Sequence, residues 1–70
     1  MMPLAMASAG ETGCIQKITG RDEVRQHLAE LGFVVGERVT VVSVLNGNMI
    51  LSVKDSRVAI DKTMGMRIMV

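Results

Sequence analysis

The sequence is almost devoid of aromatic residues: its 70 residues include one Phe and no Trp or Tyr. Grooves that recognise proline-rich peptides are lined with aromatic side chains, and small barrels that bind single-stranded nucleic acids stack bases on them. Phe33 alone cannot line either kind of groove. The eight Lys and Arg residues are balanced by seven Asp and Glu, so the net charge is only +1. Nucleic-acid binding needs a basic surface, and we therefore predict no nucleic-acid partner.

Cysteine and long apolar runs are equally scarce. A single Cys cannot close an intramolecular disulfide, and no CxxC or Cys/His spacing indicates a structural zinc site. A small domain without a disulfide is typical of a reducing compartment such as the cytoplasm. No run of about 20 apolar residues occurs, and the apolar start, Met1–Ala9, lacks the basic region of a signal peptide. We expect no direct insertion into a membrane.

Signatures of catalysis are also missing. Cys14 and His27 form the only thiol–imidazole pair in the composition, and no motif supplies a group to orient the imidazole. The seven glycines are dispersed and form neither a GxGxxG nor a GxxxxGK[ST] phosphate loop. The sequence therefore predicts that the chain is not an enzyme and requires no cofactor.

What is present indicates one mainly β domain over residues 1–70. A first strand is predicted over Thr12–Thr19, followed by a short helix with Asp22 as its N-cap. The apolar residues of this helix recur at i, i+4 and i+7 and would share one face: Val24, Leu28 and Leu31. Gly32 is expected to end the helix, because glycine readily adopts the positive φ of a helix C-terminus.

The second half of the chain shows the two-residue period of β-strands. Strands are predicted over Val39–Leu45, Met49–Lys54, Arg57–Ile60 and Arg67–Val70, with a single helical turn or irregular segment over Lys62–Met66. Asn46-Gly47 favours a tight hairpin turn, and Asp55-Ser56 favours a second turn. The alternation of apolar residues shifts by one position between Val41 and Val42, which indicates a β-bulge. Five short strands and one helix are expected to form a small twisted barrel, whose closure would remove exposed edges.

One face of the predicted helix carries a candidate metal site. Glu23, His27 and Glu30 stand at i, i+4 and i+7. Two carboxylates and an imidazole suit a divalent transition metal such as Fe²⁺ or Zn²⁺, bound weakly. The alternative is a solvated helix flank, because two helical turns seldom bring three side chains to one ion without further ligands.

Seven methionines make an adaptable apolar contact surface the favoured functional feature. Leu31, Phe33 and Val35 are candidates for an apolar clamp on a partner, with Met64 and Met66 at its rim. The alternative is that the Leu31–Gly36 corner belongs to the hydrophobic core. An apolar, Met-rich surface is also compatible with self-association.

The order of these residues resembles the FeoA family of bacterial ferrous iron uptake. The matching pattern is Leu4…Gly10-Glu11-x-Gly13-x-Ile15-x-x-Ile18, Arg25-x-x-Leu28-x-x-Leu31-Gly32-Phe33-x-x-Gly36-x-x-Val39-x-Val41, Val58-Ala59-Ile60 and Ile68-x-Val70. The resemblance implies an SH3-like barrel, a fold also appended to iron- and manganese-dependent repressors. The central hairpin is shorter than in many members, so contacts attributed to a longer loop are not carried over.

The resemblance further implies a cytoplasmic accessory protein recruited to the inner face of the membrane. Its partner would be the cytosolic region of a membrane Fe²⁺ transporter that carries a GTPase domain. A metal-sensing or metal-delivery domain, with the Glu23, His27 and Glu30 stripe as ligands, is the alternative function.

Overall fold

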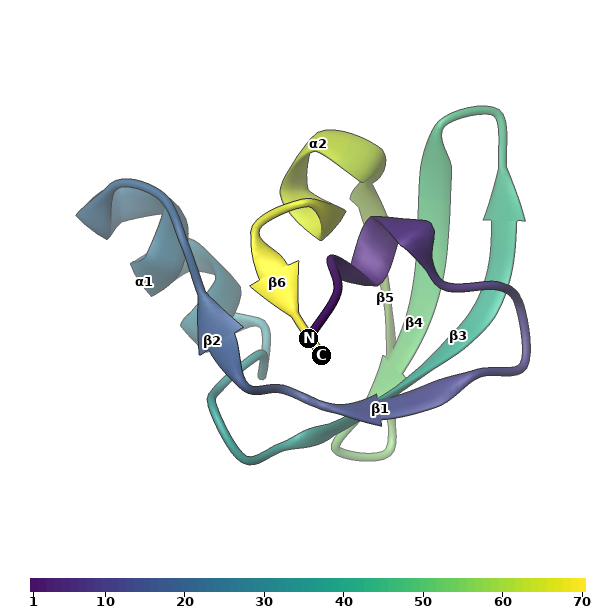
Figure 1. The fold of residues 1–70 in the computed structure, drawn as a ribbon, viewed down its shortest axis with the longest axis horizontal. Helices are drawn as coiled ribbons and strands as arrows, with labels where there is room; N and C mark the ends of the chain where they lie inside the picture. Colours follow the sequence, from purple (N-terminus) through teal and green to yellow (C-terminus); the bar gives the residue numbers. More distant parts are fainter.

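The computed structural model describes all residues 1–70 and arranges six strands in two antiparallel sheets (Figure 1). In chain order the elements are the 3-10 helix η1 (Leu4–Met6), β1 (Thr12–Cys14), β2 (Lys17–Ile18), α1 (Asp22–Glu30), β3 (Arg38–Leu45), β4 (Asn48–Val53), β5 (Ser56–Asp61), α2 (Lys62–Gly65) and β6 (Ile68–Met69). The predicted mainly β fold is confirmed, with one short helix ahead of the central strands and a single helical turn after β5.

The larger sheet has the strand order β1-β3-β4-β5 and is built around two tight hairpins. Asn46 and Gly47 connect β3 to β4 with φ values of 49° and 82°, and Lys54 and Asp55 connect β4 to β5 with 48° and 62°. Two consecutive positive φ values match the right-handed twist of the flanking strands. The first turn is as predicted; the second lies one residue earlier, because Ser56 already pairs with Val53.

The predicted bulge in β3 is confirmed. Val41 pairs with Leu51 and Ser43 with Ile50, so Val42 is the extra residue. The bulge reverses the side-chain phase of β3 beyond this point, which accounts for the break in the apolar alternation of the sequence.

The smaller sheet pairs β2 with β6 and corrects two predictions. The single strand predicted over Thr12–Thr19 is divided, because the Ile15 N–H donates to the Glu37 carbonyl and the Gln16 N–H to the Met69 carbonyl. The chain thus leaves the larger sheet for the smaller one within two residues. Backbone hydrogen bonds do not close the predicted small barrel, because β5 pairs only with β4. The barrel therefore keeps an exposed edge at β5, which the sequence-based expectation of closure did not include.

Helix α1 begins at Asp22 after an N-cap at Arg21, so Asp22 is the first helical residue and not the cap. Gly32 has φ of 107° and ends the helix as predicted. The Phe33 N–H donates to the Leu28 carbonyl, and the Gly32 N–H donates to that of Ala29, the two bonds of a Schellman motif. This turn directs Phe33 back into the core.

The core lies between the two sheets, α1 and η1 and contains no buried polar or charged residue. Nine of its eleven members come from η1, α1, β3, β4, β5 and β6, and Ile15 and Phe33 come from connecting segments; the members are Leu4, Ile15, Leu28, Phe33, Val39, Val41, Met49, Leu51, Val53, Ile60 and Ile68. Because alternate residues of β4 point inward, that strand alone contributes three of them.

Candidate functional site

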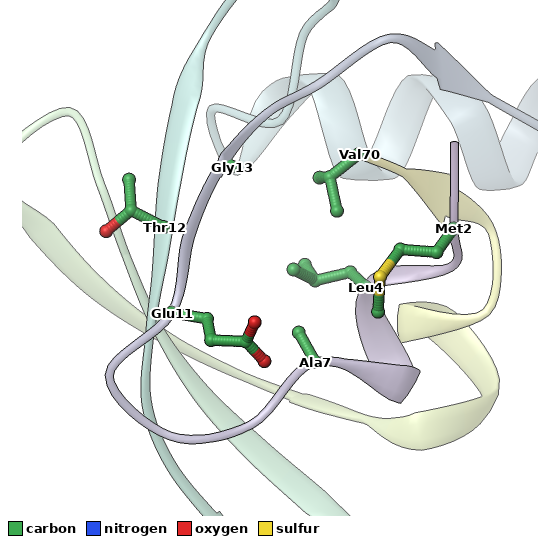
Figure 2. A pocket seen from close by; sticks show the side chains of 7 residues that line it. All are labelled: Met2, Leu4, Ala7, Glu11, Thr12, Gly13 and Val70. Carbon is green, nitrogen blue, oxygen red and sulfur yellow. The ribbon is translucent and has the colours of Figure 1, made fainter.

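The two ends of the chain meet and form one wall of an apolar pocket (Figures 1 and 2). Met2 and Val70 exchange both backbone N–H···O=C bonds at 2.8 Å, and Pro3 forms a bridge with Met69. Between this pair and β1 lies a cavity of about 210 Å³, which we call the terminal pocket. Its lining residues are Met2, Leu4, Ala7, Glu11, Thr12, Gly13 and Val70.

The terminal pocket depends on close packing of Val70 against β1. A Cβ atom at Gly13 would lie 2.9 Å from the Val70 Cβ, so only glycine lets the last residue approach this closely. Leu4 is 1% exposed and projects toward the middle of the pocket in Figure 2. Because backbone hydrogen bonds hold Met2 and Val70 in place, their side chains form a wall of the pocket that is preformed, without a ligand.

Glu11 is the one ionisable residue of the pocket lining. Its Oε1 accepts the Ser8 N–H at 2.5 Å, and the Glu11 N–H donates to the Ser8 carbonyl at 3.1 Å. The carboxylate therefore stabilises the loop between η1 and β1. The other polar side chain of the lining is Thr12, whose hydroxyl is hydrogen-bonded to the Thr40 hydroxyl at 2.9 Å.

Three exposed methionines lie within the first six residues of the chain, and one of them, Met2, lines the terminal pocket. Met1 and Met6 are 79% and 67% exposed, and Met2, which also lines the pocket, is 38% exposed. A cavity of about 150 Å³ is enough to bind benzene in an engineered protein, so this pocket has room for one apolar side chain. Unbranched, polarizable Met side chains adapt to the shape of such a guest. Sequence analysis missed this site; its available signals were Leu4 and the clustering of methionines at the start of the chain.

The predicted clamp is not assembled as one surface. Phe33 is fully buried, which corrects its assignment as a contact residue and favours the alternative that this corner belongs to the core. Leu31 is half-buried against that core. Val35 is 66% exposed, in the turn where the Gly36 N–H donates to the Ile15 carbonyl, and it alone of these three offers a large apolar surface.

The two predicted rim residues lie elsewhere. Met64, in α2, is half-buried against the core, and Met66, directly after α2, is 48% exposed. Figure 1 shows α2 well apart from the turn between α1 and β3. Val35 and Met66 therefore belong to two separate surfaces.

A wider groove lies on the outer side of the hairpins. Its volume is about 480 Å³, and its lining residues are Ser43, Leu45, Asn48, Ile50, Ala59, Ile60 and Asp61. Leu45 is 69% exposed and Ile50 is 40% exposed, so the apolar part of this groove is open to solvent.

The predicted metal stripe remains on an exposed helix flank. Glu23, His27 and Glu30 are all exposed, and the structure brings no three His, Cys, Asp or Glu side chains together in a geometry for a metal ion. The nearby Asp22 pairs instead with Arg25 at 2.6 Å. Cys14 is a free, exposed thiol. No helix has the length and apolar character needed to cross a membrane.

Comparison with known proteins finds one family over almost the whole chain. The model of the FeoA domain matches residues 2–70. A candidate Fe(2+) transport protein A from Methanocaldococcus jannaschii is 37% identical over 70 residues, which are all of this chain and 85% of that protein.

Solved structures match the fold with little deviation. The crystal structure of an iron uptake regulatory protein, FeoA, is 33% identical with a TM-score of 0.92, covering 99% of this chain and 92% of that one. FeoA from Stenotrophomonas maltophilia, an SH3-domain protein crystallised with zinc, is 25% identical with a TM-score of 0.86 over all of this chain and 89% of that one. A manganese-dependent transcriptional repressor at 17% identity shares the fold over 38% of its length, with a TM-score of 0.87.

Proposed function

This chain belongs to the FeoA family of ferrous iron transport accessory proteins, and we propose that it acts as a non-catalytic module on the cytosolic region of the GTPase-bearing Fe²⁺ transporter. The observation that carries the proposal is the family match over residues 2–70, together with a preformed apolar pocket. The S. maltophilia relative is itself described as a proposed activating factor of ferrous iron transport. The module would act in the cytoplasm, at the inner face of the membrane.

The terminal pocket is the surface best suited to the transporter. It combines a defined cavity with a partly exposed methionine, Met2, in its lining, whereas Val35 and Met66 each stand alone. A buried apolar side chain in a preformed pocket is the usual anchor of a protein interface. The occupant would be one large apolar side chain of the transporter's cytosolic region.

A titration with the transporter tests this proposal. Isotope-labelled protein is mixed with the isolated cytosolic portion of the transporter, without nucleotide and with a non-hydrolysable GTP analogue. Amide signals of Met2, Leu4 and Gly13 are expected to shift in at least one nucleotide state. Spectra that remain unchanged in every state would contradict the proposal.

Single charge substitutions identify the surface that binds. Met2→Glu is expected to weaken binding at least about tenfold, because a carboxylate would have to be buried with the guest side chain. Val35→Glu and Met66→Glu test the two predicted contact positions in the same way, and Leu45→Glu on the distant hairpin is the matched control. Loss of binding only in Val35→Glu or Met66→Glu would move the interface away from the terminal pocket.

Weak transition-metal binding is a second candidate function, favoured by the zinc-bound structure of the S. maltophilia relative. In this chain Glu23, His27 and Glu30 would supply the ligands, with rotation of their exposed side chains toward one ion. Anaerobic calorimetry with Fe²⁺ and with Zn²⁺ tests it against His27→Ala. A dissociation constant weaker than millimolar in the unmodified protein would exclude it.

A further inference from the structure

Strand β5 is an edge strand with one free side. Its only neighbour is β4, and no backbone hydrogen bond outside the helices and strands involves Ser56–Asp61. Ser56 pairs with Val53 across the tight turn between β4 and β5. At the other end of β5, the Lys62 N–H donates to the Gly47 carbonyl at 2.9 Å. Ladder bonds of antiparallel strands alternate, so even-numbered residues bond to β4. The N–H and C=O of Arg57 and Ala59, and the N–H of Asp61, therefore point to the free side.

The sequence of this edge is complementary to itself. Arg57 stands two residues before Ala59, and Asp61 stands two residues after it; all three are exposed. Neither charged residue forms an ion pair within the chain. If two copies of β5 lie antiparallel about a two-fold axis at Ala59, each Arg57 is opposite the partner's Asp61. Opposite charges in directly facing positions stabilise antiparallel strand pairs.

The Asp61 side chain can serve both this contact and its own helix. Its Oδ1 accepts the Met64 N–H at 2.8 Å as the N-cap of α2. A carboxylate has a second oxygen and further lone pairs, so an Arg57 guanidinium from the partner can bind without displacing the cap.

We propose that β5 pairs with β5 of a second copy of this chain, in the register that places Ala59 on the two-fold axis. The two Ala59 residues exchange N–H···O=C bonds, and each Asp61 N–H donates to the Arg57 carbonyl of the partner subunit. The contact is isologous, so it closes as a dimer. Val58, which is half-buried, comes to lie opposite the partner's Ile60, and this covers apolar surface near the edge.

Two features of the edge favour a second copy over solvent. The edge has no proline, bulge or inward-pointing charge to protect it, and its two charged side chains, Arg57 and Asp61, are of opposite sign and so complement those of a second copy. The side chain on the axis is the small, exposed Ala59, which leaves room for a second Ala59 opposite it. Six residues of strand bury less than the roughly 1,200 Å² of a standard stable interface, so the dimer is weak and depends on concentration.

Sedimentation equilibrium and amide exchange test the dimer on the full chain. From micromolar to millimolar concentration, the mean mass is expected to rise from 7.6 kDa toward twice that value. Exchange at the amides of Ala59 and Asp61 is expected to slow over the same range, since these N–H groups gain partners only in the dimer. A mass that stays at 7.6 kDa up to millimolar concentration would overturn the proposal.

A matched pair of variants at Ala59 separates pairing from folding. Ala59→Lys places two like charges opposite each other on the axis and is expected to abolish the dimer. Ala59→Thr, a β-branched residue at the same exposed position, is expected to retain it. Both should unfold at the temperature of the unmodified protein. Association that persists unchanged in Ala59→Lys would assign it to another surface, such as the terminal pocket, and reject the β5 pairing.

The register is tested by isotope-filtered spectroscopy on a mixture of labelled and unlabelled protein. The proposed pairing predicts a cross-peak between the Hα atoms of Val58 and the partner's Ile60, which face each other in a non-hydrogen-bonded pair. Arg57→Glu is expected to raise the dissociation constant, while Arg57→Lys retains the dimer. Intermolecular peaks that involve only other segments would contradict the proposed interface.

Discussion

The β3–β4–β5 sheet and the junction of the chain ends differ in how far along the sequence their partners lie. In the sheet, Leu45 pairs with Asn48 and Val53 with Ser56 across turns of two residues. At the junction, Met2 and Val70 exchange two hydrogen bonds that place Pro3 opposite Met69, almost the full length of the chain apart. The first region therefore follows from local signals, and the second exists only once the rest of the chain has folded.

This difference also separates the two surfaces that we propose to bind partners. The edge of β5 presents backbone groups of a locally determined strand, and its register follows from the preceding turn. The terminal pocket presents side chains from the start, the end and the β1 region of the chain. We therefore expect mutations at the junction to affect both stability and partner binding, and mutations at the hairpin tips to affect stability alone.

Leu4→Ala should break the junction most severely. Leu4 is 1% exposed, and removal of a buried leucine side chain is expected to lower the free energy of unfolding by about 3 kcal/mol. That is a large share of the stability of a domain this small. Urea denaturation followed by circular dichroism measures the change.

Leu45→Ala is the control for Leu4→Ala in the hairpin region. Leu45 is 69% exposed, so the same truncation should change stability by less than about 0.5 kcal/mol. Equal losses in the two variants would show that η1 contributes nothing beyond the average surface residue.

Gly13→Ala should have the next largest effect, because it opposes the close approach of the C-terminal residue. The added Cβ would lie 2.9 Å from the Val70 Cβ, and such overpacking is expected to destabilise the fold by about 2 kcal/mol. Thermal unfolding of Gly13→Ala, Val70→Ala and the double variant tests the contact. The double variant should lose less stability than the sum of the two single variants. Strict additivity would mean that Gly13 and Val70 are not coupled.

Asn46→Ala should have the smallest of the three effects and should be confined to the hairpins. Asn46 has φ of 49°, and an alanine in this left-handed conformation is expected to cost about 1 kcal/mol. Asn46→Gly should be tolerated, since glycine has no Cβ to clash. Chemical shifts at the terminal pocket should remain unchanged in both variants. Shifts at Leu4 or Val70 would show that the two regions are more tightly coupled than their contacts indicate.

The sequence predicted those parts of the fold whose signals lie within a few residues of one another. The pair Asn46-Gly47 indicated a turn, Gly32 indicated the end of α1, and the adjacent Val41 and Val42 indicated a bulge. All three predictions are confirmed. Each depends on a local backbone requirement that few residue types satisfy. The second turn was predicted one residue too late because Lys54 adopts a positive φ, although lysine is not a residue type that favours this conformation.

Side-chain environment was less predictable than backbone conformation. Phe33 was assigned to a partner surface because it is the only aromatic residue, yet the Schellman turn directs it into the core. The spacing of Glu23, His27 and Glu30 places them along the exposed flank of α1, but the structure does not bring three such side chains together in a geometry for a metal ion. The terminal pocket had no motif at all, since its walls come from segments that are separated by most of the chain.

Composition and local pattern determined that this is a mainly β domain with a single aromatic residue and many methionines, and the resemblance of its motifs indicated the FeoA family. Tertiary structure alone decided where the strand predicted over Thr12–Thr19 divides, which apolar residues remain exposed, and that the chain ends meet around a pocket. The physical reason is the range of the interactions. Turn and helix-end preferences act over two to five residues, whereas burial and strand pairing depend on every segment that reaches the same place.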